Sequence, residues 1–308
     1  MNKTKRVIGP IGIIFGSLTL LLSLAITFGS SLGLSFVPTW PQIYKAVGLG
    51  ENEPIEENCV SVADVGDADC IVIQSQGECA VIDTGNVGDN GQKVLSFLKS
   101  RGVKQVDYLI LTHYHDDHIG GAERIITELP VGIILLPEYD PDPKDSPLGA
   151  RVLSAAENSA AKVHRFSEGL TFSVGNFRFE VALAMNEAKD DNDRSVVLKA
   201  NGFDMNFLFM ADAGEAAEKA FLAKFPDYKA DFLKVGHHGS ATASTEEFIN
   251  AVHPTYAAIS CGTRWESVPS TEVMKRLKNV GANIKRTDIN SHIIYYFENG
   301  GVRIETER

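Results

Sequence analysis

After a short basic start, the N-terminal segment of the 308-residue sequence has no charged side chain. Three cations occupy its first six residues, and no charged side chain follows until Lys45. In between, 11–28 is an unbroken run of apolar, Gly, Ser and Thr residues, about long enough to span a bilayer as a helix. Positive charge before such a run predicts a cytoplasmic N-terminus and an exported remainder. We therefore predict a membrane anchor or signal segment over 1–36.

A cleaved signal peptide is the alternative interpretation of this segment. We favour an anchor, because no convincing small-x-small cleavage site ends the run and no Cys near its end could take a lipid. Residues 37–57 contain several Pro and Gly residues and are predicted to be a linker. Residues 58–308 remain as one globular domain.

Cysteine is scarce: the chain has four, and none shows a metal-ligand spacing such as C-x-x-C. We interpret them as small buried apolar residues. The alternative is a disulfide bond between Cys70 and Cys79, which could form if the domain lies outside the cell. Ser240 lacks the G-x-S-x-G setting of a serine nucleophile. The sequence therefore gives no sign of Cys-based metal binding or serine catalysis.

Positive charge is also in deficit, with a formal net charge of −11. Such a surface is unfavourable for gripping a polyanion over a broad area. It does not exclude a polyanion from one metal-lined cleft.

From residue 58 onward, β-branched runs alternate with Gly- and Asp-rich turns, and helices are inserted between them. The pattern predicts a hairpin around Gly77 and helices at 91–102 and 149–162. Strands that come first as meanders suit a two-sheet sandwich flanked by helices better than a doubly wound parallel sheet. The predicted fold class is α/β, of the α+β kind.

Three histidines and two aspartates crowd into "HYHDDH" at 113–118, directly after an apolar run. His113 and His115, two positions apart at a strand end, can converge on one cation. Asp117 and His118, on the following turn, can reach a second cation nearby. Imidazole and carboxylate together suit Zn²⁺, Mn²⁺ or Fe.

The segment "HYHDDH" resembles the HxHxDH signature of the metallo-β-lactamase fold hydrolases. Over about Val60 to the C-terminus, the chain resembles more specifically the hydrolase domain of the ComEC/Rec2 competence proteins. The matching motifs occur in order: "ADVGDADCIVIQ", "VIDTG", "NDRSVVL", "FMADA" and "LKVGHHGS". The resemblance implies an αββα sandwich, here preceded by one membrane helix.

The resemblance also implies a site for two divalent metal ions, with Zn²⁺ preferred and Mn²⁺ or Fe as alternatives. Its implied ligands are His113, His115, Asp117, His118, Asp212 and His237. Asp212 would bridge both ions, and Asp117 would also act in catalysis. Asp83 and His238 are expected to support a ligand or contact substrate, and His238 is the alternative to His237 as the last ligand.

The sequence departs from the wider family in one respect. Many members carry another His ligand between the HxHxDH motif and the bridging Asp. The only His in that interval is His164, which we expect on the surface. Asn192 and Ser195 stand at the position of the missing ligand motif, as they do in the ComEC-like group, and could support the site or contact substrate.

Two bridged metals would hold a hydroxide and polarise an electrophile. We therefore expect a membrane-anchored, extracytoplasmic hydrolase of a phosphodiester: DNA, a phosphate-containing envelope polymer or a choline ester. One alternative is a β-lactamase- or lactonase-like hydrolase of a small cyclic amide or ester. Another is a non-catalytic envelope binding module. The oligomeric state cannot be inferred from the sequence.

Overall fold

The computed structural model divides the chain into two units, 1–53 and 54–308. Its described residues are 23, 24, 27, 37, 57–183, 188, 191–265, 267–298 and 301–308. No helix within these residues is long and apolar enough to cross a membrane. The predicted anchor at 11–28 lies almost entirely outside them and stays a prediction.

The first of two mixed sheets has eight strands in the order β15-β14-β1-β2-β3-β4-β5-β6. Strands β3 to β6 run parallel, whereas the other pairs are antiparallel. Its strands are β1 (Cys59–Val62), β2 (Ile71–Ser75), β3 (Glu78–Ile82), β4 (Val106–Ile110), β5 (Val131–Leu136), β6 (Lys162–Arg165), β14 (Ile293–Glu298) and β15 (Gly301–Thr306).

The second sheet has seven strands in the order β13-β12-β11-β10-β9-β8-β7. Here β10 to β13 run parallel, and the hairpins β7–β8 and β9–β10 are antiparallel. Its strands are β7 (Thr171–Val174), β8 (Phe177–Leu183), β9 (Val197–Gly202), β10 (Met205–Phe209), β11 (Phe232–Lys234), β12 (Tyr256–Ile259) and β13 (Asn283–Arg286).

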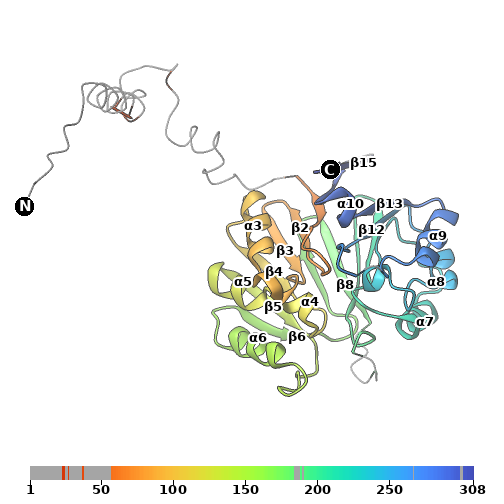
Figure 1. The fold of residues 1–308 in the computed structure, drawn as a ribbon, viewed down its shortest axis with the longest axis horizontal. Helices are drawn as coiled ribbons and strands as arrows, with labels where there is room; N and C mark the ends of the chain where they lie inside the picture. Colours follow the sequence, from red (N-terminus) through yellow and green to blue (C-terminus); the bar gives the residue numbers. More distant parts are fainter. Residues whose placement is uncertain are drawn as a thin grey trace, which may run out of the picture. The chain divides into compact units, whose positions relative to one another are not determined.

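Helices cover the outer face of each sheet, which gives four layers (Figure 1). On the first sheet lie α3 (Gln92–Ser100), α4 (Asp116–Ile119), α5 (Ala122–Glu128) and α6 (Pro147–Glu157). On the second lie α7 (Glu215–Lys224), α8 (Glu246–Val252) and α9 (Thr271–Asn279). Short turns of helix complete the described part: η1 (Val87–Asp89), η2 (Gly236–Gly239) and α10 (Thr287–Asn290).

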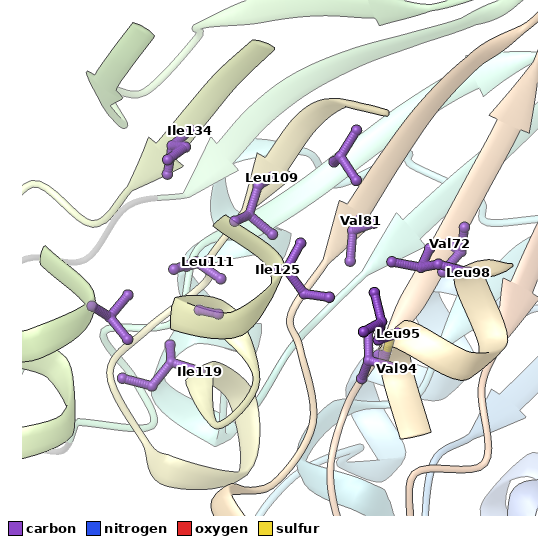
Figure 2. Close-up of a cluster of buried hydrophobic side chains, with 14 of the residues drawn as sticks. Val72, Val81, Val94, Leu95, Leu98, Leu109, Leu111, Ile119, Ile125 and Ile134 are labelled. Carbon is purple, nitrogen blue, oxygen red and sulfur yellow. The ribbon is translucent and has the colours of Figure 1, made fainter. Parts of the chain in front are cut away.

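Alternating side chains of the strands build separate cores on the two faces of each sheet. Figure 2 shows one outer core, where Val81 and Leu109 of the first sheet pack against Leu95 of α3 and Ile125 of α5. The core between the sheets is rich in phenylalanine, as at Phe207 of β10. Burial on both faces holds the strand ends in fixed positions.

The predicted two-sheet sandwich and the hairpin at Gly77 are confirmed. The helix predicted over 149–162 is wrong at both ends, because α6 begins at Pro147 and ends at Glu157. Asn158 N–H donates to Ser154 O there, and edge strand β6 begins a few residues later. All four cysteines are buried and unpaired, as the favoured interpretation expected.

Candidate metal centre

The polar side chains singled out in the sequence follow strand ends in both sheets. Asp83 follows β3 and the HYHDDH motif follows β4, and these strands run parallel, so both segments leave the same sheet edge. Asp212 follows β10 and the His237–His238 pair follows β11, which also run parallel. Ligands and binding residues commonly lie at such carboxyl ends of parallel strands.

Backbone contacts fix the motif loop against the loop after β3. Thr84 N–H donates to His118 O (2.6 Å), and Gly120 N–H donates to Gly85 O (2.9 Å). A Cβ atom at Gly120 would lie only 2.2 Å from Val87 N, so only glycine permits this approach. The second part of the motif, "DDHIGG", is therefore held as a unit against its neighbour.

Four donors from both sheets meet at the centre: Asp117, His118, Asp212 and His238. Their donor atoms all lie within 4.8 Å of one another. We call them the four-donor group. His118 Nε2 is 3.3 Å from Asp212 Oδ1, and His238 Nε2 is 3.3 Å from Asp117 Oδ2. His238 Nε2 to Asp212 Oδ1 measures 3.6 Å, and His118 Nε2 to Asp117 Oδ2 measures 3.9 Å.

These separations fit a tetrahedral cation. Ligand atoms at the usual Zn–N and Zn–O distances lie about 3.4 Å from each other in a regular tetrahedron. His118 Nε2, Asp212 Oδ1 and His238 Nε2 are buried and have no hydrogen-bond partner among the described residues. Leaving a buried polar atom unpartnered costs about 1–3 kcal/mol, and a bound metal ion would remove that cost for all three. The donor set therefore fits a divalent transition metal.

The other ring nitrogens of the two histidines are held by hydrogen bonds. His118 Nδ1 donates to Asp83 Oδ2 (2.7 Å), and His238 Nδ1 donates to Ser260 O (3.0 Å). Asp83 also accepts from the N–H (2.9 Å) and hydroxyl (2.8 Å) of Thr112. When each imidazole is neutral, a proton on Nδ1 leaves the Nε2 lone pair for a metal ion, an arrangement typical of histidine metal ligands.

A second group contains His113, His115 and Asp212, and we call it the three-donor group. His113 Nδ1 lies between two hydroxyls, Thr112 Oγ1 (3.1 Å) and Ser195 Oγ (3.2 Å). Ser195 Oγ also accepts from Asp212 N–H (3.2 Å). Ser195 thus connects a histidine of one sheet to the shared aspartate of the other through hydrogen bonds, but it belongs to neither group of possible metal ligands.

The charged groups of the centre shift one another's pKa values. Burial alone would lower the pKa of His118, but the carboxylates of Asp212, Asp83 and Asp117 raise it well above its usual value. Burial would raise the pKa of Asp212, yet the positive charge of protonated His118 holds it well below its usual value. Asp117 behaves in the same way, with a pKa of about 2. By contrast, burial and the nearby His118 lower the pKa of His113, which favours its neutral form.

The structure places His238, not His237, in the four-donor group. The His238 side chain is 1% exposed, whereas that of His237 is 27% exposed and its Nδ1 faces Thr242 Oγ1 at 3.1 Å. His237 Nε2 remains 3.8 Å from Asp212 Oδ2. The geometry therefore favours His238, the alternative given for the last ligand, over His237.

The backbone conformation explains why only one of these adjacent histidines joins the four-donor group. Both histidines have left-handed conformations, with φ of 47° and 53°, so the segment is a tight turn rather than an extended strand. Asp83 (φ 59°) and Ala211 (φ 47°) share this conformation. For residues other than glycine this conformation is costly and persists only where the surrounding structure holds it. Several loops that carry the centre are thus held in strained conformations.

An ion pair behind the centre was missed in the sequence. Lys234, fully buried, donates to Asp69 Oδ2 (2.8 Å), and Asp69 Oδ1 lies 3.6 Å from His238 Nδ1. The available signal was a lysine inside the apolar strand "DFLKV". Asp64, in the same loop between β1 and β2 as Asp69, accepts from Gly66 N–H and belongs to neither donor group.

The remaining predicted residues, His164 and Asn192, lie outside both donor groups. His164 is exposed on edge strand β6 and belongs to neither donor group. Asn192 lines a cavity of about 470 Å³ together with His237 and Thr242. The ring of Trp265 lies 5.5 Å from that of His238.

Comparisons with known proteins agree with this geometry. Residues 63–263 match the sequence model of the metallo-beta-lactamase superfamily. ComE operon protein 3 of Bacillus subtilis (strain 168) is 35% identical over 68% of this chain and 27% of its own length. Competence protein ComA of Neisseria gonorrhoeae is 28% identical over 84% of this chain and 35% of its own length. The chain thus spans about a third or less of these relatives.

Among solved structures, the metallo-beta-lactamase fold protein YhfI from Bacillus subtilis superposes with a TM-score of 0.54. It is 12% identical in sequence, and the match covers 76% of this chain and 98% of YhfI. This likeness concerns the fold alone. With its buried His/Asp donor groups, and its similarity to competence proteins, the chain belongs to the metallo-beta-lactamase superfamily.

Proposed function

We propose that the protein is a metal-dependent phosphodiesterase whose catalytic domain lies outside the cytoplasmic membrane. The main support for metal-dependent hydrolysis is the spacing of the donor atoms in the four-donor group, which matches the ligands of a tetrahedral cation. Its three buried unpartnered atoms support the same conclusion.

His118 and His238 would hold one ion through Nε2, together with Asp117. His113 and His115 would hold the other, and Asp212 would bridge the two. When bound, such a pair of ions supplies an activated water and a Lewis acid for hydrolysis. Asp83 fixes the His118 ring by accepting a hydrogen bond from its Nδ1–H, and Ser195 fixes His113 and Asp212 relative to each other. Zn²⁺ suits this set of donors, with Mn²⁺ or Fe as alternatives.

A phosphodiester suits two such ions, because they can stabilise both the attacking and the leaving oxygen. In the reaction, a water oxygen bonds to phosphorus, the ester P–O bond breaks, and the alcohol leaves with one proton. The remaining water proton stays on the phosphomonoester or passes to solvent. Similarity to competence proteins over most of the chain favours this substrate class over a lactam or lactone.

The membrane location is supported by the sequence alone. The charge-free run at 11–28 follows three cations and is long enough to anchor the chain. Protease added to intact, wall-stripped cells should therefore digest the catalytic domain. Protection until the cells are lysed would place the domain in the cytoplasm instead.

The catalytic proposal is tested with the full chain purified in detergent. Its metal content is measured after reconstitution with Zn²⁺ or Mn²⁺, and its activity on bis(p-nitrophenyl) phosphate, DNA and nitrocefin is compared. We expect up to two ions per chain and release of p-nitrophenol. Metal binding with hydrolysis of nitrocefin alone would favour the β-lactamase-like alternative. Absence of stoichiometric metal would leave the binding-module alternative.

A further inference from the structure

A fully buried lysine lies behind the metal centre. Lys234 is the last residue of β11, a central strand of the second sheet, and its side chain has no exposed surface. Phe232 packs in the core between the sheets and Leu233 in the outer core, so strand alternation points Lys234 between the sheets again. Lysine is almost never fully buried unless it is paired. Core packing alone therefore does not explain this residue.

The lysine is paired with a carboxylate that comes from the other sheet. Lys234 Nζ donates to Asp69 Oδ2 (2.8 Å) and to Val235 O (3.2 Å). Asp69 lies in the loop before β2 of the first sheet, and its side chain is also fully buried. The ion pair therefore crosses from one sheet to the other.

Asp69 contacts both halves of the four-donor group. Its N–H donates to Asp117 O (3.1 Å), and its carbonyl oxygen accepts from Gly85 N–H (2.8 Å). Its Oδ1 lies 3.6 Å from His238 Nδ1 and is buried without a hydrogen-bond partner among the described residues. Asp117 comes from the first sheet and His238 from the second. Asp69 thus lies between the two loops that must meet around the ion.

Lys234 also provides the positive charge that Asp69 would otherwise take from a metal ion. Donor atoms of Asp69, Asp83 and His118 all lie within 4.8 Å of one another, so these residues form a third set of possible metal ligands. His118 Nδ1 already donates to Asp83, and the lysine ammonium already donates to Asp69. The ammonium group therefore occupies this third set, which leaves a metal ion to the four-donor group.

Stability alone is a poor explanation for this ion pair. Removing two charges from water costs about as much as their mutual attraction contributes, so an uncharged pair of similar volume is often equally stable. Loss of one partner is different, because the other charge is then buried without compensation. The pair is better explained by the positions that it fixes.

We propose that Lys234 and Asp69 are positioning residues that close the four-donor group, an inference that rests on the proposed function. Lys234 belongs to the same short segment as His238, and it holds the Asp69 carboxylate. Asp69 in turn holds Asp117 through its backbone. The pair thereby fixes the separation between Asp117 Oδ2 and His238 Nε2, which is 3.3 Å.

The test compares stability with metal affinity in variants of the full chain purified in detergent. Asp69→Asn and Lys234→Met each leave one buried charge uncompensated, so each should lower the melting temperature of the metal-free protein. The double variant Asp69→Asn/Lys234→Met has neither charge and should regain most of that loss. Its affinity for Zn²⁺, measured by competition with a chelator, should still be about tenfold lower than that of the parent protein. If a single variant fails to fold, the double variant still makes the comparison.

Co²⁺ is a second probe, because its visible absorption reports the geometry of its ligands. The first equivalent should give the spectrum of a tetrahedral site in the parent protein, and the double variant should lose this spectrum.

Arg101→Met is the matched control, because it also removes a buried cation. The Arg101 guanidinium donates to Gln74, Tyr296 and Cys59, and Gln74 lies near the end of β2 that is farther from Asp69. This variant should lower the melting temperature but leave the Zn²⁺ affinity and the Co²⁺ spectrum unchanged.

An affinity that recovers together with the melting temperature in the double variant would show that the pair serves stability alone, and would overturn the inference. A double variant that does not fold, or an equal loss of affinity in Arg101→Met, would overturn it as well. These measurements need no turnover. A parent protein that binds metal but hydrolyses no phosphodiester would therefore refute the proposed function, while the affinities still decide the inference. A parent protein that binds no metal would refute both.

Discussion

The two donor groups of the metal centre share Asp212 but differ in their other members. The four-donor group adds an aspartate and two buried histidines whose Nδ1 atoms are held by hydrogen bonds. The three-donor group adds only His113 and His115, and their rings are 3.0 Å apart at the nearest nitrogens. One group can surround an ion, whereas the other leaves a ligand position open.

This difference teaches that the two metal positions are unequal. A closed tetrahedral set binds its metal firmly, whereas an open position leaves room for water or substrate. Ser195 occupies the region of the missing histidine and connects His113 to Asp212 N–H instead. We infer that the four-donor group holds its metal more tightly than the three-donor group.

Asp212→Ala should have the largest effect, because Asp212 is the only residue in both groups. Its loss would weaken both metal positions and reduce phosphodiesterase activity by more than ~10²-fold. Metal content and kcat/KM of the purified variant are the measurements. A variant that keeps both ions and its activity would show that the two groups do not form one bridged centre.

His238→Ala and His237→Ala should separate the four-donor group from its surroundings. His238→Ala is expected to lose one metal equivalent together with activity, because its Nε2 completes that group. His237→Ala should keep both metal equivalents, because its ring is partly exposed and belongs to neither group. Each variant is the control for the other, and the opposite pattern of metal content would restore His237 as the ligand.

The contrast between these histidines shows what the sequence could predict. The spacing of "HYHDDH" after an apolar run was sufficient to identify donors on one loop, and the family motifs located Asp212. The choice between adjacent histidines depended on backbone conformation. The structure has a left-handed turn there, stabilised by tertiary contacts such as His237 N–H to Ala211 O (2.8 Å).

The fold was predictable for a similar reason. Strand and turn patterns are local, so the sandwich and the hairpin at Gly77 could be identified from the sequence. The end of α6 depends on packing and was placed too late. Buried polar pairs are the least predictable feature. Lys234 meets Asp69 from a position 165 residues away, and nothing local predicts their contact.

Asp83→Asn should have a smaller effect, confined to the four-donor group. The carboxylate accepts a hydrogen bond from the Nδ1–H of His118, and removal of its charge should weaken metal binding there by about 10- to 100-fold. Competition with a chelator measures the affinity. Asp64→Asn is the matched control, because Asp64 lies in another loop and contacts no donor of either group. Equal affinities of the two variants would refute the role of Asp83.

His164→Ala should have the smallest effect, and it tests whether the three-donor group lacks a histidine. His164 is the only histidine between the motif and Asp212, so it is the only histidine of that interval that could fill the missing position. It lies on the edge strand β6, opposite Leu135 of the neighbouring strand β5, and its side chain is exposed to solvent. Surface substitutions of this kind usually change stability by less than about 0.5 kcal/mol. Metal content, kcat/KM and melting temperature of His164→Ala should therefore all match the parent protein. Loss of one metal ion in this variant would mean that β6 rearranges to complete the three-donor group, and that the two groups are more alike than the structure indicates.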